Sequence, residues 1–237
     1  MPQRDDEGNG IVALIPAYNE AAHIEGVVRG VRAYLPALVV DDGSTDETAA
    51  LATAAGAQLL HQPRNRGKGH ALRAGFRWAL EQGYRAVLTL DADGQHDPAD
   101  IPLFLNAYRD TQADLIIGTR DFHRIPGIRR FTNSLGRVLF SWAIGQDIPD
   151  NQSGFRLLSR RMVEAALAGR EGGFEFEVEM IVACVELGYK LAWVPIRTIY
   201  AGERSHISPL KHTWHFLRMV AQTRRRLRSM SGRGAKA

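Results

Sequence analysis

The sequence predicts an α/β protein whose mostly parallel, Rossmann-like sheet is covered by helices on both faces. Short apolar runs alternate with segments of helical periodicity over residues 10–120. Strands and helices of this length, joined in this order, form parallel strands with crossover helices. The chain has 237 residues, of which 45% are hydrophobic, which is enough for one substantial core.

The first element expected is a strand over residues 10–19, GIVALIPAYN, followed by a helix over residues 19–35. Apolar side chains recur in that helix at spacings of three and four, and Asn19 is expected to be its N-cap. Residues 37–44, ALVVDDGS, predict the second strand. Both strands are largely apolar, as strands buried on two faces are.

The next helix is expected to begin with a capping box formed by Ser44 and Glu47 and to end at Gly56. Asp46 and Asp97 each stand near a helix start, where a carboxylate commonly caps the backbone. The remaining elements of this half are strands over residues 57–62, 85–94 and 114–120 and helices over residues 69–83 and 98–110, the last with Pro98 near its first turn.

The charges are distributed unevenly along the chain. From Arg204 to the end there are 9 Lys and Arg and no Asp or Glu, which leaves 21 of the 30 basic residues against all 26 acidic ones. A basic tail on an acidic body indicates an anionic partner such as lipid headgroups, nucleic acid or phosphates. We expect a disordered N-terminus over residues 1–9, one domain over residues 10–203, and a basic loop, amphipathic helix and disordered tail over residues 204–237.

Several classes of protein are disfavoured by the sequence. Cys184 is the single cysteine, so no disulfide forms within the chain, which suits a cytoplasmic location. The polar start MPQRDDEGNG does not resemble a signal peptide, and no run approaches the ~20 apolar residues of a spanning helix. There is no GxxxxGK[ST], no GxGxxG after a strand and no GxSxG, which argues against P-loop, nicotinamide and serine-hydrolase sites.

Acidic and polar residues follow three of the expected strands, in PAYNE, DDGSTD and DADGQHD. Ligands of open α/β sheets bind outside the carboxyl ends of the strands. Asp91 and Asp93 would repel each other unless a cation offsets their charges. With Gln95 they offer part of a shell for Mg²⁺ or Mn²⁺, completed by substrate phosphate oxygens. Such a cation would neutralise a diphosphate leaving group.

The segments IPAYNE, VVDDGSTDET, NRGKGHALRAGF, LDADGQHDP, IIGTR and DNQSGFRLL resemble, in this order, the signatures of family-2 glycosyltransferases with the GT-A fold. The nearest subgroup is the polyprenyl-phosphate (dolichyl-phosphate) sugar transferases, and the resemblance covers roughly residues 10–215. It implies an inverting hexosyltransferase with a GDP-mannose or UDP-glucose type of donor, Mg²⁺ or Mn²⁺, and a polyprenyl phosphate acceptor. Tyr200 departs from the mannose synthases, which have an arginine there, so the sugar stays open.

The resemblance also implies roles for individual residues. Asp93 and Gln95 would be the direct metal ligands, and Asp91, the first acid of the DxD, would contact ribose or metal-bound water. Asp41 would support the loop that carries Asp42. The implied nucleotide site consists of Pro16, Tyr18, Glu20, Asp41, Asp42, Lys68 and Asp91. The implied contacts to the acceptor phosphate are Arg120, Arg130, Ser134, Arg156, Arg204, Ser205 and Lys211.

The acceptor decides which residues act in catalysis. A monoalkyl phosphate is mostly a dianion at neutral pH, so it needs cations, such as Arg120, more than a base. A hydroxyl acceptor would need a general base, and Asp150 would then be the candidate. Glu175, Glu177 and Glu179 alternate, which fits either the acceptor side or a helix start with favourable dipole interactions.

Residues 122–145 and 208–230 mix basic residues with aromatic and aliphatic ones. Each is expected either to pack on the body or to lie at the membrane surface, and a lipid acceptor favours peripheral contact at the cytoplasmic face. Two alternatives to the lipid-phosphate transferase remain. One has a saccharide or small-molecule hydroxyl as acceptor, and the other is a non-catalytic nucleotide- or nucleic-acid-binding protein. The intact DADGQ argues against the second, so no nucleic acid partner is expected.

Overall fold

The computed structural model describes residues 10–120, 140–142, 144–169 and 176–197. The chain divides into two compact units, residues 1–121 with 152–199 and residues 122–151 with 200–237. The sheet and its helices belong to the first unit. The boundary expected between residues 9 and 10 coincides with the start of the described residues, and the one between 203 and 204 lies outside them; both stay predictions.

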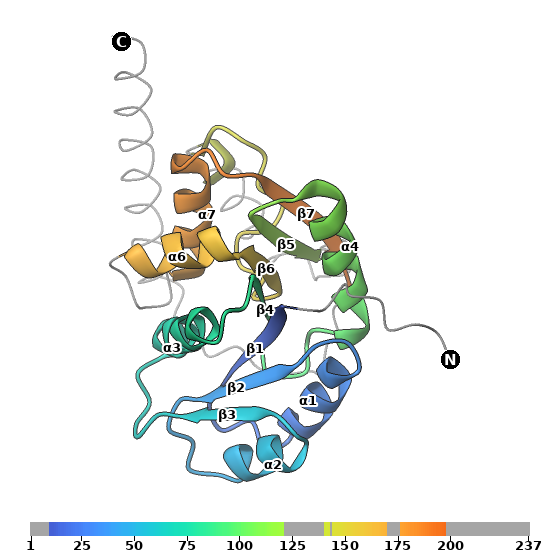
Figure 1. Ribbon diagram of the computed structural model, residues 1–237, viewed down its shortest axis with the longest axis vertical. Coiled ribbons are helices and arrows are strands. Elements are labelled where there is room, and N and C mark those ends of the chain that lie inside the picture. Colours follow the sequence, from blue (N-terminus) through green and yellow to red (C-terminus); the bar gives the residue numbers. More distant parts are fainter. Residues whose placement is uncertain (1–9, 121–139, 143, 170–175, 198–237) are drawn as a thin grey trace, which may run out of the picture. The chain divides into compact units, whose positions relative to one another are not determined.

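Within the described residues, seven strands form one sheet in the order β3-β2-β1-β4-β6-β5-β7 (Figure 1). Every neighbouring pair is parallel except those of β6, which runs antiparallel to both β4 and β5. The mostly parallel sheet is therefore confirmed. The strands are β1 (Ile11–Ala17), β2 (Ala37–Asp41), β3 (Gln58–His61), β4 (Ala86–Thr89), β5 (Leu115–Arg120), β6 (Arg156–Ser159) and β7 (Leu191–Ile196).

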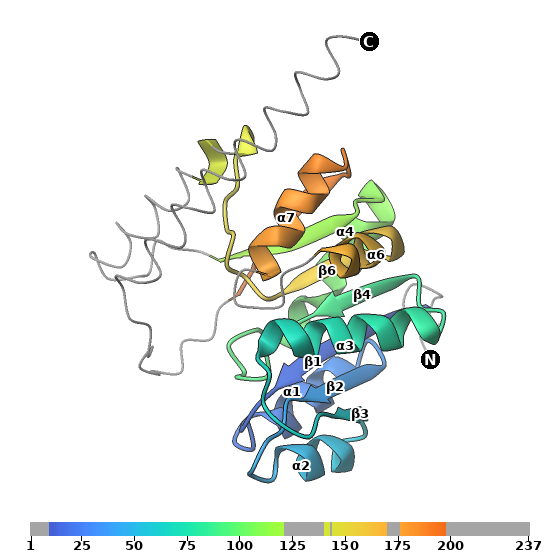
Figure 2. The ribbon, with the colours of Figure 1, turned by 90° about the vertical axis from the view of Figure 1, so that its left-hand side faces the viewer.

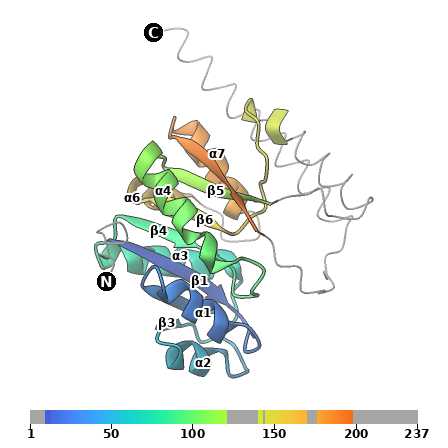
Figure 3. The same cartoon turned by 90° about the vertical axis from the view of Figure 1, so that its right-hand side faces the viewer.

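Helices cover both faces of this sheet. One face carries α1 (Ile24–Arg32), α2 (Thr48–Ala54) and α4 (Ile101–Thr111), which follows the 3-10 turn η2 (Pro98–Asp100) (Figure 3). The other face carries α3 (Lys68–Glu81), α6 (Arg160–Ala168) and α7 (Phe176–Glu186) (Figure 2). Successive side chains of β1 point to opposite faces of the sheet, so they pack against both layers of helices.

The packing of β1 shows this division. Ile11, Ala13 and Ile15 belong to the buried cluster that includes α1, α2 and α4. Leu14 points to the opposite face and packs against Gly75 of α3, where a β-carbon would overlap the Leu14 side chain. Close approach of α3 to the sheet therefore depends on the absence of a side chain at residue 75.

Two predicted helix caps are wrong. α1 begins at Ile24, and Asn19 has φ 54° with no capping bond. Its Oδ1 accepts from the Thr45 backbone N–H (2.8 Å), while Ser44 Oγ accepts from the Asn19 N–H (2.9 Å). Glu47 is the N-cap of α2 but caps with no side-chain bond. These polar side chains join the loops after β1 and β2 instead of capping helices.

The other turn assignments hold. Gly56 follows the last residues of α2 with φ 89°, which suits glycine at a helix end. Asp97 caps η2 by accepting from the Ala99 N–H (2.9 Å). Asp46 accepts from the Thr48 N–H (3.0 Å) at the start of α2. In the described part of the chain, no helix is long and apolar enough to cross a bilayer.

Candidate active site

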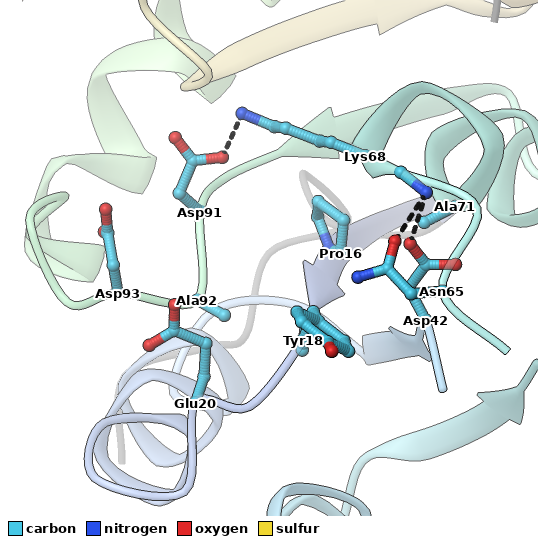
Figure 4. A pocket seen from close by; sticks show the side chains of 12 residues that line it. Pro16, Tyr18, Glu20, Asp42, Asn65, Lys68, Ala71, Asp91, Ala92 and Asp93 are labelled. Carbon is cyan, nitrogen blue, oxygen red and sulfur yellow. Dashed lines mark hydrogen bonds and ion pairs between the residues drawn. The ribbon is translucent and has the colours of Figure 1, made fainter. Parts of the chain in front are cut away.

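A pocket of about 360 Å³ lies where β1, β2 and β4 end (Figure 4). Parallel neighbouring strands bring their carboxyl ends to one edge, so the loops after them meet there. The N-terminus of α3 and the loop before it complete the wall. The residues that line the pocket are Pro16, Ala17, Tyr18, Glu20, Asp42, Asn65, Gly67, Lys68, Ala71, Asp91, Ala92 and Asp93.

Seven residues that the sequence assigned to the nucleotide or the metal lie together in this lining. They come from one strand, three different loops and one helix, so their convergence is a property of the sheet and not of local sequence. Tyr18 is 44% exposed, which leaves much of its side chain open to solvent. The seven are Pro16, Tyr18, Glu20, Asp42, Lys68, Asp91 and Asp93.

Asp41 and Asp42 fix the walls of the pocket. Asp41 is fully buried and does not line the pocket; its oxygens accept from the Ser44 N–H (3.1 Å) and contact His61 Nδ1 (2.7 Å). Asp42 accepts from the backbone N–H groups of Arg66 (3.0 Å) and Gly67 (2.7 Å). Two adjacent carboxylates therefore hold the loop after β2 and the loop that leads into α3.

Asp91 is bound on two sides. One oxygen pairs with Lys68 Nζ, and the other lies 3.5 Å from His96 Nε2. Burial alone would raise the pKa of Asp91, but the Lys68 ammonium and His96 outweigh it and hold the pKa well below its ordinary range. Lys68 shows the reverse balance: burial opposes its charge, while Asp91 and Glu177 raise its pKa. The two groups are a charged pair at neutral pH.

Asp93 lies in a different electrostatic setting. Its Oδ1 accepts from the Gln95 N–H (3.0 Å). Burial raises the pKa of Asp93; the Gln95 N–H opposes this rise and the negative Asp91 adds to it. A cation beside Asp93 would therefore be favourable, because it would stabilise a carboxylate that its surroundings penalise.

The oxygen donors of the pocket are of the kind that magnesium or manganese ions bind. No group of three or more His, Cys, Asp or Glu able to hold a metal occurs in the described part of the chain. Mg²⁺ needs no such group, since it keeps several waters and binds through one or two carboxylates plus substrate phosphates. Asp93 at the wall of a pocket of this size fits that kind of site.

Four other predicted residues do not line the pocket. Gln95 is half-buried in the turn after Asp93, and Arg120 is the half-buried last residue of β5. Asp150 is buried and belongs to the second unit. Arg156 is fully buried; its guanidinium donates to the carbonyls of Ser153 (2.7 Å) and Glu177. The expected contact of Arg156 with an acceptor phosphate stays a prediction for a side chain that is fully buried in this structure.

The remaining residues expected at the acceptor phosphate lie outside the described residues, and their roles stay predictions. They are Arg130, Ser134, Arg204, Ser205 and Lys211.

The structure also adds residues to which the sequence gave no role. Asn65 and Gly67 line the pocket, and both belong to the segment NRGKG, which resembles a family signature. Glu177 binds Lys68 (2.9 Å), but in the sequence it was one of three alternating glutamates. Gly154 packs against Asp91, where a β-carbon would lie 2.5 Å from Oδ2. No local pattern predicted that contact, since it joins residues 63 positions apart.

The sequence is similar to those of known proteins. A profile of the family described as "Glycosyl transferase family 2" matches residues 12–167. Undecaprenyl-phosphate mannosyltransferase of Micrococcus luteus is 34% identical over 204 residues, covering 78% of this chain and 82% of that protein. Polyprenol monophosphomannose synthase of Mycolicibacterium smegmatis is 31% identical over 201 residues, covering 78% and 76%.

A solved structure supports the fold. Glucosyl-3-phosphoglycerate synthase of Mycobacterium tuberculosis, crystallised with Mn²⁺ and UDP-glucose, matches with a TM-score of 0.71 at 23% identity, covering 92% of this chain and 78% of that one. Identity at this level speaks for the GT-A architecture alone. Together with the family profile and the two mannosyltransferase relatives, it shows that the chain is a glycosyltransferase with the GT-A fold and belongs to glycosyltransferase family 2.

Proposed function

We propose that the protein is an inverting hexosyltransferase that moves a sugar from a GDP- or UDP-linked donor to a polyprenyl phosphate at the membrane surface. The observation that carries the proposal is the single pocket wall shared by Tyr18, Asp42 and Asp93. One end offers an aromatic ring and a buried carboxylate for a nucleoside, and the other offers a carboxylate suited to a cation beside a diphosphate. One relative named above is an undecaprenyl-phosphate mannosyltransferase, and the other is a polyprenol monophosphomannose synthase.

The residues of this chain would divide the work. Tyr18 would contact the base, and Asp42 would orient the base or ribose while it holds the Arg66–Gly67 backbone. Asp93 would hold Mg²⁺ or Mn²⁺, which would neutralise the charge that develops on the departing diphosphate. The solved relative was crystallised with Mn²⁺ and a UDP-sugar, which supports this choice of metal and nucleotide class.

The acceptor is chosen on chemical grounds. A monoalkyl phosphate dianion is already a nucleophile. Transfer of the sugar to it therefore needs screening of negative charge more than removal of a proton. No base is therefore required of Asp150, which is buried at 3% exposure. Peripheral contact at the cytoplasmic face is part of the same proposal, since the enzyme must reach a lipid-borne phosphate.

The test is a transfer assay with purified protein, Mg²⁺ or Mn²⁺, a panel of radiolabelled GDP- and UDP-sugars, and polyprenyl phosphate in vesicles. Label should move into the organic phase with one donor class. Asp93→Asn should lower the rate about 100-fold or more. The matched control Asp110→Asn, at an exposed carboxylate of α4 paired with Arg109, should retain it.

Three results would overturn parts of the proposal. If label moves only to added soluble sugars, the acceptor is a hydroxyl and not a lipid phosphate. Full activity in excess chelator would exclude a catalytic role for the metal. The anomeric configuration of the product is measured by proton NMR. A configuration that is unchanged from the donor would contradict inversion.

A further inference from the structure

Lys68 joins two carboxylates from distant parts of the chain. Its ammonium pairs with Asp91, after β4, and with Glu177 Oε1 (2.9 Å), in the first turn of α7. Figure 4 shows the side chain of Lys68 crossing the pocket wall to reach Asp91. The side chains of Asp91 and Glu177 are 26% and 14% exposed, so both charges are partly removed from water. Two such carboxylates need a cation close by, and Lys68 supplies it.

A second set of contacts closes this arrangement into a ring. Arg156 of β6 donates to the carbonyls of Ser153 (2.7 Å) and Glu177. Thr89 Oγ1 donates to the Gly154 carbonyl (2.8 Å), and Gly154 packs against the Asp91 carboxylate. Asp91 is thus held by Lys68 on one side and by the backbone before β6 on the other. Glu177 is held by Lys68 through its side chain and by Arg156 through its carbonyl.

Asp93 has no comparable partner among the interactions described. Its side chain accepts only a backbone N–H, from Gln95, while Asp91 engages Lys68 and His96. The two acids of DADGQ are therefore not equivalent. One is neutralised within the protein, and the other is left with its charge facing the pocket.

We infer that Lys68 and Glu177 form a charge clamp, in which Lys68 is a tethered cation that withholds Asp91 from divalent metal. The inference rests on the proposed function, because it concerns how that site receives its metal. In it, Asp91 and Glu177 are positioning residues. The nucleotide-free protein offers Asp93 alone and holds a divalent cation weakly. Strong metal binding then requires the donor diphosphate, so metal and donor enter as one unit.

The clamp is tested by Mn²⁺ binding to nucleotide-free protein, followed by electron paramagnetic resonance of free Mn²⁺. Lys68→Met should tighten Mn²⁺ binding about tenfold or more, because Asp91 and Glu177 then lack their cation and interact strongly with a dication. The double variant with Lys68→Met and Glu177→Gln should lose most of this gain. Lys190→Met is the matched control, since its ammonium donates to the Thr111 carbonyl outside the pocket, and it should bind as wild type.

Unchanged or weaker Mn²⁺ binding in a folded Lys68→Met protein would overturn the clamp. Folding is checked by circular dichroism and melting temperature, and Lys68→Gln, which keeps a hydrogen-bond donor, replaces Lys68→Met if that variant does not fold. Tight Mn²⁺ binding by the wild-type protein without nucleotide would overturn it equally. The readout needs no turnover, so a failed clamp leaves wild-type sugar transfer intact, whereas a failed function shows only in the transfer assay.

Discussion

Gly75 of α3 lies directly against Leu14 of β1, and the two elements touch where a side chain at residue 75 would have to stand. α3 begins with Lys68, which lines the pocket. The depth at which α3 sits on the sheet therefore sets the position of a residue of the site.

Gly75→Ala should destabilise the protein by about 1–3 kcal/mol, because the added methyl group overpacks a buried contact. The matched control is Gly26→Ala in α1, where nothing lies within 4 Å of the new β-carbon. That change should stabilise by about 0.5–1 kcal/mol through helix propensity. Urea unfolding of both variants measures the difference, and equal stabilities would contradict the packing argument.

Asp114 should contribute to stability at neutral pH and lose that contribution in acid. Burial would raise its pKa, but hydrogen bonds from Arg161, the Lys190 N–H (2.9 Å) and Ser159 Oγ (2.9 Å) outweigh burial and lower it. A lowered pKa in the folded state means that the contribution is present above the ordinary value of about 3.9 and disappears as pH falls through the lower folded value.

We therefore expect Asp114→Asn to cost about 1–3 kcal/mol at pH 7, discounted for the exposed Arg161 side chain. The difference from wild type should shrink when urea unfolding is repeated below pH 4. A difference that stays constant from pH 7 to pH 2 would show that the charge of Asp114 is not responsible.

Cys184 should be unreactive in the folded protein. It is fully buried, and burial raises the pKa of its thiol to about 12, with Asp114 adding to the rise and Arg161 opposing it. Since the thiolate is the reactive form, labelling by iodoacetamide at pH 8 should follow unfolding. Mass spectrometry should find the single cysteine unmodified in buffer and modified in urea; fast labelling of native protein would contradict its burial.

Asp42→Asn should weaken donor binding more than it slows turnover. One carboxylate oxygen becomes an amide that cannot accept from the Arg66 or Gly67 N–H, so the loop at the pocket wall loses a charged hydrogen bond. At about 1.5–3 kcal/mol for such a bond, the KM for the donor should rise roughly 10- to 100-fold. A fall in kcat at constant KM would assign Asp42 to the chemical step instead.

The first half of the fold was predictable because apolar residues recur at helical spacing in its helices and form short continuous runs in its strands. β6 was not predicted as a strand, since its four residues show no alternation and include the fully buried Arg156. β7 contains Pro195, which argues against a strand by local propensity. The predicted capping roles of Asn19 and Ser44 were wrong because their side chains accept hydrogen bonds from backbone groups of a neighbouring loop. Such contacts between loops cannot be inferred from local sequence.

The site was predictable where it follows from strand ends. Pro16 lies near the end of β1, Asp42 follows β2 and Asp91 follows β4, so the topology of these parallel strands brings the three residues together. Glu177 and Gly154 come from beyond residue 150, and the antiparallel β6 brings Gly154 to Asp91. The direction of β6 could not be inferred from its composition. The contact between Gly154 and Asp91 depends on that direction, so it could not be predicted either.

The reversed direction of β6 has a consequence for the connection between β5 and β6. β5 leaves the sheet beside the point at which β6 enters it, since Ile117 pairs with Arg156 and the Gly118 N–H donates to the Phe155 carbonyl (2.9 Å). The stretch of chain between these two strands thus departs from and returns to the same margin. Both ends of this stretch are fixed at neighbouring backbone positions of one sheet, so a change in its length need not alter the pairing of β5 with β6.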